Sequence, residues 1–216
     1  MENVILSFHD CVIKQSDMNL LDGPEWLNDR LISFFFQYLE KVKYGTYEKG
    51  VCFIDPEVCQ CIKLSRGSCV GVFADPHDLQ KKDLILLTVN DCEDEEAAGG
   101  THWSLLVFVR HFNSFYHFDS FGGANLEHGR DVMNHLIPFV KCESMPSLVE
   151  ATCLQQQNSF DCGIHVICNA EYICAKYLEH FQGDVMDYVT LQSISGKRKW
   201  LKKCPDAIGS DSANDR

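Results

Sequence analysis

The sequence predicts one α+β domain, because a helical start, a strand-rich middle and further helices follow one another along its 216 residues. A chain of this length can bury roughly 70% of its unfolded surface, so it needs neither a metal nor a disulfide for stability. The composition is 45% hydrophobic and 23% charged, which is typical of a globular protein and excludes intrinsic disorder. We therefore expect a single domain over residues 1–204, followed by a small, polar and flexible tail over 205–216.

Local patterns predict each element in turn. Pro24 suits the first turn of a helix that starts near Asp22, and an apolar stripe at helical spacing follows it. The stripe consists of Leu27, Leu31, Phe34, Phe35, Tyr38, Leu39 and Val42. Residues 84–89 form a continuous apolar run, which is typical of a strand covered on both faces. The other predicted elements are a strand over 51–54, a helix opening at 55–56, a hairpin of strands 102–109 and 114–119, a helix over 126–137 that ends near Pro138, a strand over 148–154 and a helix over 163–178.

The charge balance excludes several classes of partner. Nineteen Lys and Arg residues stand against 31 Asp and Glu residues, which gives a net charge of −12. This acidity argues against binding to nucleic acid or to an anionic membrane surface, and it suits a basic protein partner. The sequence contains no apolar run of about 18 residues and no secretory signal at its start. We therefore expect an intracellular protein of the cytoplasm or nucleus, or of both.

The 12 cysteines are the first unusual feature of the composition. Without a secretory signal they are expected to be reduced thiols. Cys52, Cys59, Cys61, Cys69 and His77 lie close together in the sequence, but no Cys-x-x-Cys pair occurs and the spacings fit no common zinc module. We expect no metal and no cofactor, with most of the cysteines buried as small hydrophobic side chains.

Two charged segments stand out. Residues 91–96 form an acidic run that leads into two alanines and two glycines, which predicts an exposed, mobile loop. Near the end of the chain a basic patch is expected to be a solvated C-terminal face rather than a binding site. The basic patch consists of Lys197, Arg198, Lys199, Lys202 and Lys203.

Cys162 is the candidate nucleophile. It lies where a polar, turn-rich stretch meets the start of an apolar helix, so the helix dipole and unpaired backbone N–H groups favour its thiolate. The glycine that follows, Gly163, leaves room for another backbone, such as a substrate chain, to approach closely.

A thiolate nucleophile needs a base, and the base needs an orienting group. If the predicted hairpin turns around Phe112, opposed residues have numbers that sum to about 224, and His102 and Asp119 sum to 221. Directly opposed Cβ atoms lie roughly 4.5–5.5 Å apart, so the carboxylate can reach the imidazole. The spacing alone does not choose His102 over His117.

Acyl transfer also needs donors for the developing oxyanion. The backbone N–H of Cys162 is one candidate, and the side-chain amide of Gln156, six residues upstream, is a second. Gln155 and Gln157 compete with Gln156 on spacing alone.

These motifs resemble those of a known family. His-Trp opens one strand, Asp-Ser ends the next, and Gln-x-Asn-Ser-x-Asp-Cys-Gly surrounds the candidate nucleophile. Together they resemble the Ulp/sentrin-specific cysteine proteases, which remove ubiquitin-like modifiers; the order His, Asp, Gln, Cys differs from the papain order, which begins with Cys. The resemblance spans roughly residues 1–200, and segments 16–29, 90–107 and 156–163 look like the small deneddylase members, which act on the Nedd modifier rather than on SUMO.

The resemblance implies a fold, a reaction and a partner. The fold would be the papain-like, adenain-like cysteine protease fold, with a central mixed sheet flanked by helices. The reaction would be cleavage after the C-terminal Gly-Gly of a Nedd-type modifier, both in precursors and in isopeptide conjugates, by a monomeric enzyme. Within this scheme Cys162 is the nucleophile, His102 the base and then the acid, Asp119 the orienting group and Gln156 the oxyanion donor.

The resemblance also implies substrate contacts. Trp26 and Trp103 would form the walls of a narrow channel for the Gly-Gly tail, although Trp26 could equally be a core residue of the first helix. Asp29 would pair with a basic residue just upstream of that tail. The acidic loop over 91–100 would act as a substrate clamp, because its glycines permit movement and its acids suit a basic modifier face.

Three rival functions remain open from the sequence. A desumoylating protease of the same family would share the triad and the channel. An acyltransferase would use the same Cys, His and Asp set but would pass the acyl group to an amine. A modifier-binding module without catalysis would bind the modifier and leave it intact.

Overall fold

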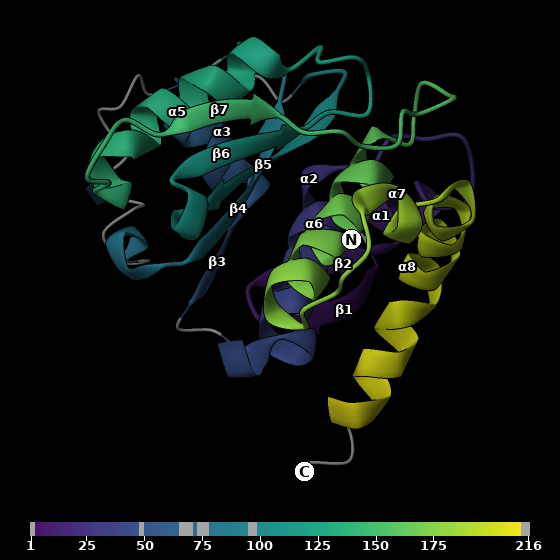
Figure 1. Cartoon of the computed structure of the whole chain (residues 1–216). Helices are drawn as coiled ribbons and strands as arrows, with labels where there is room; N and C mark the ends of the chain where they lie inside the picture. The colour runs from purple at the N-terminus through teal and green to yellow at the C-terminus, as the bar shows by residue number, and fades with distance from the viewer. Residues whose placement is uncertain (1–2, 48–49, 65–70, 73–77, 95–98, 213–216) are drawn as a thin grey trace.

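The computed structural model describes residues 3–47, 50–64, 71–72, 78–94 and 99–212 (Figure 1). Its centre is a five-stranded mixed sheet in the order β3-β4-β5-β6-β7, and a separate antiparallel hairpin pairs β1 with β2. β3 is parallel to β4 and β7 is parallel to β6, whereas β5 in the middle is antiparallel to both β4 and β6. The strands are β1 (Val4–Phe8), β2 (Cys11–Lys14), β3 (Val51–Ile54), β4 (Leu84–Asn90), β5 (Trp103–Val109), β6 (Ser114–Phe118) and β7 (Ser147–Glu150).

Helices cover both faces of the sheet (Figure 1). They are α1 (Gln15–Asn19), α2 (Asp29–Tyr38), α3 (Pro56–Leu64), α5 (Leu126–Val140), α6 (Cys162–Leu178), α7 (Val185–Tyr188) and α8 (Leu191–Ser212), with short 3-10 or π turns at Leu39–Lys43, Gly45–Tyr47, Leu79–Lys81 and Arg110–Phe112. None of the helices in the described part of the chain is both long and apolar enough to span a membrane. The predicted mixed sheet with flanking helices is thus confirmed.

Strand alternation divides the core into two layers. On β5, Leu105 and Val107 face α2 and α6, whereas Leu106 and Phe108 face α3 and α5. All four side chains have 0% exposure, which explains why this stretch reads as a continuous apolar run rather than an alternating one. The register of β5 against β4 and β6 sets the position of the residues just before the strand.

The first helix begins seven residues later than predicted. α2 starts at Asp29, because the side chain of Asn28 accepts a hydrogen bond from Leu31 N at 3.1 Å and caps the helix. The segment around Pro24 forms turns instead, and Trp26 lies in the extended link between these turns and α2. Leu27 precedes α2 and is nevertheless buried. Val42, the last residue of the predicted stripe, is 54% exposed.

Other boundaries differ as well. α5 continues through Pro138 to Val140, so the proline lies inside the last turn of the helix and does not end it. The strand predicted over 148–154 is shorter and ends at Glu150. The β1–β2 hairpin and α8 were not predicted. α8 passes residue 204 and reaches Ser212, so part of the expected tail is helical, and residues 213–216 lie outside the described residues.

Candidate active site

The β5–β6 hairpin brings His102 and Asp119 together. Opposed residues of the ladder, such as Leu105 and Phe118, have numbers that sum to 223, one less than the predicted register. His102 lies just before β5 and Asp119 just after β6, and His102 Nε2 is hydrogen-bonded to Asp119 Oδ1 at 2.6 Å. Both side chains are buried. The predicted pair is therefore in contact in the structure.

Backbone donors complete the surroundings of the Asp119 carboxylate. Phe121 N donates to Oδ1 and Asn125 N donates to Oδ2, each at 2.8 Å. Burial raises the pKa of Asp119, but the hydrogen bonds from His102, Asn125 and Phe121 outweigh burial and hold the pKa below its usual value. The carboxylate is therefore ionised at neutral pH and fixed in orientation toward the imidazole.

Cys162 is the first residue of α6, at the positive end of a helix of 17 residues. Cys162 is 1% exposed, and its thiol lies close enough to the imidazole of His102 to influence the pKa of that ring. Burial lowers the pKa of His102, but the hydrogen bonds and charges of Asp119 and Cys162 outweigh burial and raise the pKa to about 9. Because Nε2 contacts Asp119, Nδ1 is the ring nitrogen left for the thiol. The three side chains form one continuous line from carboxylate to sulfur.

The alternative base, His117, lies elsewhere. Its Nε2 is hydrogen-bonded to Ser104 Oγ at 2.8 Å, and it faces α5, where a Cβ added to Gly129 would lie 3.2 Å from its ring. Burial lowers the pKa of His117 to about 4, so the ring is neutral at physiological pH. His117 is therefore a structural residue of the other core layer.

Two residues that the sequence analysis missed hold the His102 backbone. Asp91 Oδ1 accepts hydrogen bonds from Thr101 N at 2.6 Å and from His102 N at 3.0 Å. Asn125 Nδ2 donates to the carbonyl oxygens of Val89 and His102, both at 3.3 Å. In the sequence, Asp91 indicated only the start of an acidic run, and nothing in the local sequence around Asn125 indicates its distant partners.

The three neighbouring glutamines have different surroundings. Gln155 Oε1 accepts from Gly122 N at 2.8 Å and its Nε2 donates to Asp119 O at 3.0 Å, so its amide supports the loop after β6. Gln156 is half-buried, its Oε1 accepts from Ser120 Oγ at 2.9 Å, and its Nε2 donates to Asn158 O at 2.7 Å. That bond uses one of the two N–H groups of Gln156 Nε2, whereas Gln157 is exposed. Gln156 is thus the glutamine whose amide is both fixed and able to donate once more.

The two tryptophans are held in place through their indole N–H groups. Trp26 Nε1 donates to Ser159 O at 2.6 Å, next to the loop before Cys162, and Trp103 Nε1 donates to Leu27 O at 3.0 Å. Trp26 is 45% exposed, so the core interpretation of Trp26 is wrong. Asp29 is half-buried in the first turn of α2, where its Oδ1 accepts from Arg30 N at 2.9 Å.

Gly163 does not leave room for a substrate chain, contrary to the expectation. A Cβ at this position would lie 2.8 Å from Leu27 Cβ and 3.2 Å from Leu27 Cγ. The side chain of Leu27 therefore already occupies the space that the glycine opens. Gly163 allows α6 to pack closely against the segment that carries Trp26.

The basic patch is largely ion-paired instead of solvated. Arg198, with 14% side-chain exposure, contacts Asp161 Oδ1 through Nη2 at 2.7 Å and through Nε at 3.2 Å. Lys197 pairs with Glu171, and Lys202 pairs with Asp22. The expectation of a solvated face is therefore wrong for Arg198 and Lys197, whereas Lys202 is 51% exposed and its ion pair lies in water.

Part of the predicted substrate clamp lies outside the described residues, which omit 95–98. The described part begins with Asp91, which is committed to the His102 backbone, and continues to the exposed Glu93 and Asp94. Beneath it, Lys63 Nζ donates to the carbonyl oxygens of Asn90 and Cys92. The start of the loop is thus fixed to α3 and β4.

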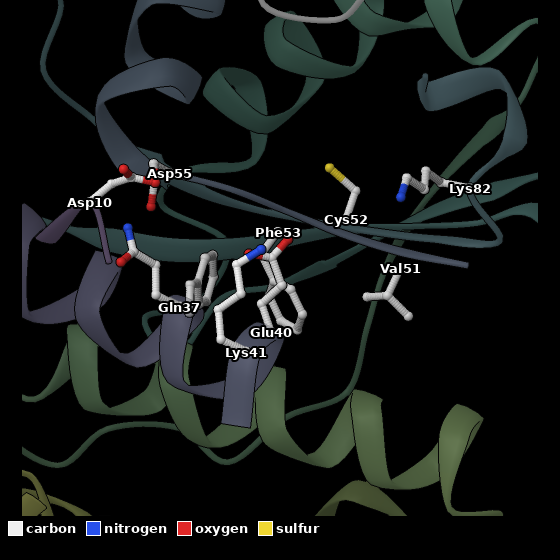
Figure 2. A pocket seen from close by; sticks show the side chains of 10 residues that line it. Asp10, Gln37, Glu40, Lys41, Val51, Cys52, Phe53, Asp55 and Lys82 are labelled. Carbon is white, nitrogen blue, oxygen red and sulfur yellow. The ribbon is translucent and has the colours of Figure 1, made fainter. Parts of the chain in front are cut away.

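Within the described residues, no group of three or more His, Cys, Asp or Glu side chains is arranged to hold a metal. Of the cysteine-rich cluster considered above, Cys69 and His77 lie outside the described residues. A cavity of about 310 Å³ lies between α2 and β3 (Figure 2). Asp10, Asp55 and Gln37 lie at one end and Lys82 at the other, and none of the candidate site residues lines this cavity.

Comparisons with known proteins agree with this geometry. Residues 25–202 match the family described as "Ulp1 protease family, C-terminal catalytic domain". The chain belongs to the Ulp1 protease family. Its predicted membership of the Ulp/sentrin-specific proteases is therefore confirmed, and so is its class as a cysteine-type peptidase.

Individual members of the Ulp1 family are similar to this chain over most of its length. "Sentrin-specific protease 8" of Homo sapiens is 39% identical over 201 residues, which cover 92% of this chain and 94% of the human protein. "NEDD8-specific protease 1" of Arabidopsis thaliana is 36% identical over 180 residues, which cover 80% of this chain and 76% of the plant protein.

A solved structure confirms the predicted Ulp1-type fold. The C-terminal Ulp1 protease domain in complex with Smt3, the yeast ortholog of SUMO, matches with a TM-score of 0.76. The match covers 95% of this chain and 87% of the yeast domain, at 17% sequence identity.

Proposed function

We propose that this Ulp1-family protease hydrolyses the bond that follows the C-terminal Gly-Gly of a NEDD8-type modifier, in precursors and in isopeptide conjugates. Cys162 is the nucleophile, His102 the base and then the acid, and Asp119 the group that orients and charges His102. The observation that carries the proposal is the line of contacts from Asp119 through His102 to Cys162 at the start of α6. The names of the human and plant relatives given above support the choice of modifier.

The reaction follows from the protonation state of His102. With the pKa of His102 raised to about 9, the imidazolium beside Cys162 persists at neutral pH and stabilises the thiolate. The thiolate attacks the carbonyl carbon of the terminal glycine, a C–S bond forms, and the carbonyl electrons move to oxygen. The backbone N–H of Cys162 and the side-chain N–H of Gln156 donate to this oxyanion.

Collapse of the tetrahedral intermediate breaks the C–N bond, and His102 gives its proton to the leaving amine. Water then attacks the thioester while His102 takes the water's proton; the C–S bond breaks, which releases the modifier with a free C-terminal carboxyl group and regenerates the Cys162 thiolate beside the His102 imidazolium. Asp119 stays ionised throughout and holds the ring in one tautomer.

Selectivity for a Gly-Gly tail follows from the two tryptophans. Trp26 is tied to the loop before the nucleophile through Ser159, and Trp103 is tied to Leu27, the residue that follows Trp26. Flat aromatic walls admit a chain without side chains and exclude bulkier residues. Asp29 at the start of α2 offers a carboxylate to a basic residue upstream of the tail.

A matched panel of precursors tests the proposal. Nedd-type, SUMO-type and ubiquitin precursors, each with the same short C-terminal extension, are compared by kcat/KM for wild type and for Cys162→Ala. We expect the Nedd-type precursor to be cleaved at least about 10-fold faster than the others, a difference of about 1.4 kcal/mol, and no cleavage by Cys162→Ala. Faster cleavage of the SUMO precursor would assign the alternative desumoylating activity.

The same panel separates the other rivals. An acyltransferase would transfer the modifier to an added amine in preference to water, and a modifier-binding module would bind the Nedd-type precursor and leave it intact. Membership of a protease family favours hydrolysis over both. We further propose that the enzyme acts as a monomer in the cytoplasm or nucleus, on modifier conjugates and without nucleic acid or membrane partners.

A further inference from the structure

Phe121 is a large apolar side chain that is 61% exposed although it lies in contact with buried polar residues. Its ring centroid is 5.8 Å from that of His102, with an angle of 56° between the rings. Single exposed apolar side chains are common on protein surfaces, but this ring borders the imidazole of the proposed site and therefore lies within reach of a bound substrate.

The loop that carries Phe121 is built to hold the ring in one place. Phe121 N donates to Asp119 Oδ1 at 2.8 Å, and Gly122 N donates to Gln155 Oε1 at 2.8 Å. Gly122 and Gly123 follow with positive φ angles of 61° and 79°, a conformation that glycine adopts without strain and that turns the chain sharply away. The backbone that carries the ring is thus fixed before any substrate binds, which lowers the entropy cost of using the ring as a contact.

The geometry of an amide bond places the leaving group near this ring. The modifier's tail reaches the carbonyl carbon between Trp26 and Trp103, which are anchored to Ser159 and Leu27. The two halves of a trans amide diverge from the carbonyl, so the leaving half extends away from the tail channel. It must also pass His102, because His102 gives it a proton. Phe121 comes from a different segment, the loop between β6 and α5, and borders the same imidazole.

We propose that Phe121 forms the leaving-group subsite and contacts the aliphatic stem of the lysine in isopeptide conjugates. This inference rests on the proposed function and adds to it the chemical class that the enzyme recognises beyond the scissile bond. The four methylene groups of a lysine stem lie flat on an aromatic face, and the imidazole beside that face receives the ε-nitrogen. The subsite makes no demand on the residues that flank the lysine.

Two substrates with equal bond chemistry isolate this contact. In the first, the modifier's terminal glycine is joined to the ε-amine of lysine in a short peptide; in the second, it is joined to methylamine. Both leaving groups are primary alkylamines of similar basicity, so they differ in the stem and not in the chemistry. We expect Phe121→Ala to lower kcat/KM for the lysine substrate about 10-fold, and for the methylamide less than 2-fold. A 10-fold loss equals about 1.4 kcal/mol, which roughly two buried methylene groups would supply. Phe121→Leu, which keeps an apolar contact, should restore most of the rate.

The chain offers a matched control in Phe112. It is 52% exposed, and its ring lies 4.8 Å from that of His111 at the opposite end of the same hairpin. Phe112→Ala should leave both substrates unchanged. An equal loss on both substrates in Phe121→Ala would overturn the proposal and give Phe121 a role in positioning His102 or in folding, which thermal unfolding of the variant distinguishes. If wild type cleaves neither substrate, or Cys162→Ala cleaves both, the proposed function fails rather than the subsite.

Discussion

Replacing Arg198 should destabilise the protein far more than its place in a basic surface patch suggests. Its guanidinium contacts Asp161 Oδ1 twice, and Nη1 and Nη2 also donate to Leu20 O at 2.8 Å and Glu25 O at 3.0 Å. Asp161 directly precedes Cys162, and Glu25 directly precedes Trp26. One side chain on α8 therefore joins the start of α6 to the loop that carries a proposed wall of the channel.

The magnitude follows from the burial of the pair. Side-chain exposure is 14% for Arg198 and 15% for Asp161, so the pair is largely shielded from water. Removing one partner of a fully buried pair costs about 3–5 kcal/mol. Asp161 keeps the hydrogen bond from Asn158 Nδ2 at 2.9 Å and some access to water, so we expect Arg198→Ala to lose about 2–4 kcal/mol of unfolding free energy. Arg198→Lys should recover less than half of it, because an ammonium group cannot reproduce the planar fork.

Urea unfolding of the two variants measures these losses directly. Lys199→Ala is the matched control, because Lys199 is an exposed neighbour on the same helix, and it should stay within about 0.5 kcal/mol of wild type. A loss below about 1 kcal/mol in Arg198→Ala, or full rescue by lysine, would refute the reasoning that this contact network holds the site together.

Three further predictions concern pH and packing. Since the pKa of His102 is raised to about 9, its contribution to stability is complete below pH 6.5 and is lost as pH rises through 9. For the same reason kcat/KM should fall above about pH 9. Asp119→Asn should move this alkaline limb of the pH–rate profile to lower pH. Burial lowers the pKa of His117 to about 4, so as pH falls from 6.5 to 4 the wild type should lose up to about 3 kcal/mol of unfolding free energy through this group. In urea unfolding experiments over the same pH range, His117→Gln should lose less unfolding free energy than the wild type. An equal pH dependence of the two proteins would contradict this prediction. Gly163→Ala places the new Cβ 2.8 Å from the leucine side chain that fills this space, so overpacking of about 1–3 kcal/mol should exceed the gain in helix propensity and lower Tm. Gly196→Ala meets nothing within 4 Å and should raise Tm, and a higher Tm in both variants would show that the first site relaxes without cost.

The parts of the account that the sequence could predict depend on local patterns. Residues close together in the chain determine the apolar runs of β4 and β5, the β5–β6 hairpin and the helix that begins at Cys162. The hairpin sum was accurate to one residue, and this was enough to bring His102 and Asp119 into contact. The three residues of the proposed triad could therefore be named from the sequence, although only the resemblance to the family chose His102 over His117.

The parts that the sequence could not predict depend on contacts between distant segments. Asp91 and Arg198 looked like solvated charges, yet one holds the His102 backbone and the other links residues separated by more than 170 positions. Pro24 suggested a helix start, but Asn28 provides the cap that begins α2. The space beside Gly163 belongs to Leu27, and no local pattern reveals which side chain will fill it.

Mapping the site of covalent capture tests the central claim most directly. The wild-type protein is treated with a Nedd-type modifier that carries a C-terminal vinyl sulfone, and the adduct is located by peptide mass spectrometry. The account predicts that, of 12 cysteines, only Cys162 is modified, and that folded His102→Ala reacts at least 10-fold more slowly, a difference of about 1.4 kcal/mol. An adduct on another cysteine, or capture by His102→Ala at the wild-type rate, would contradict it.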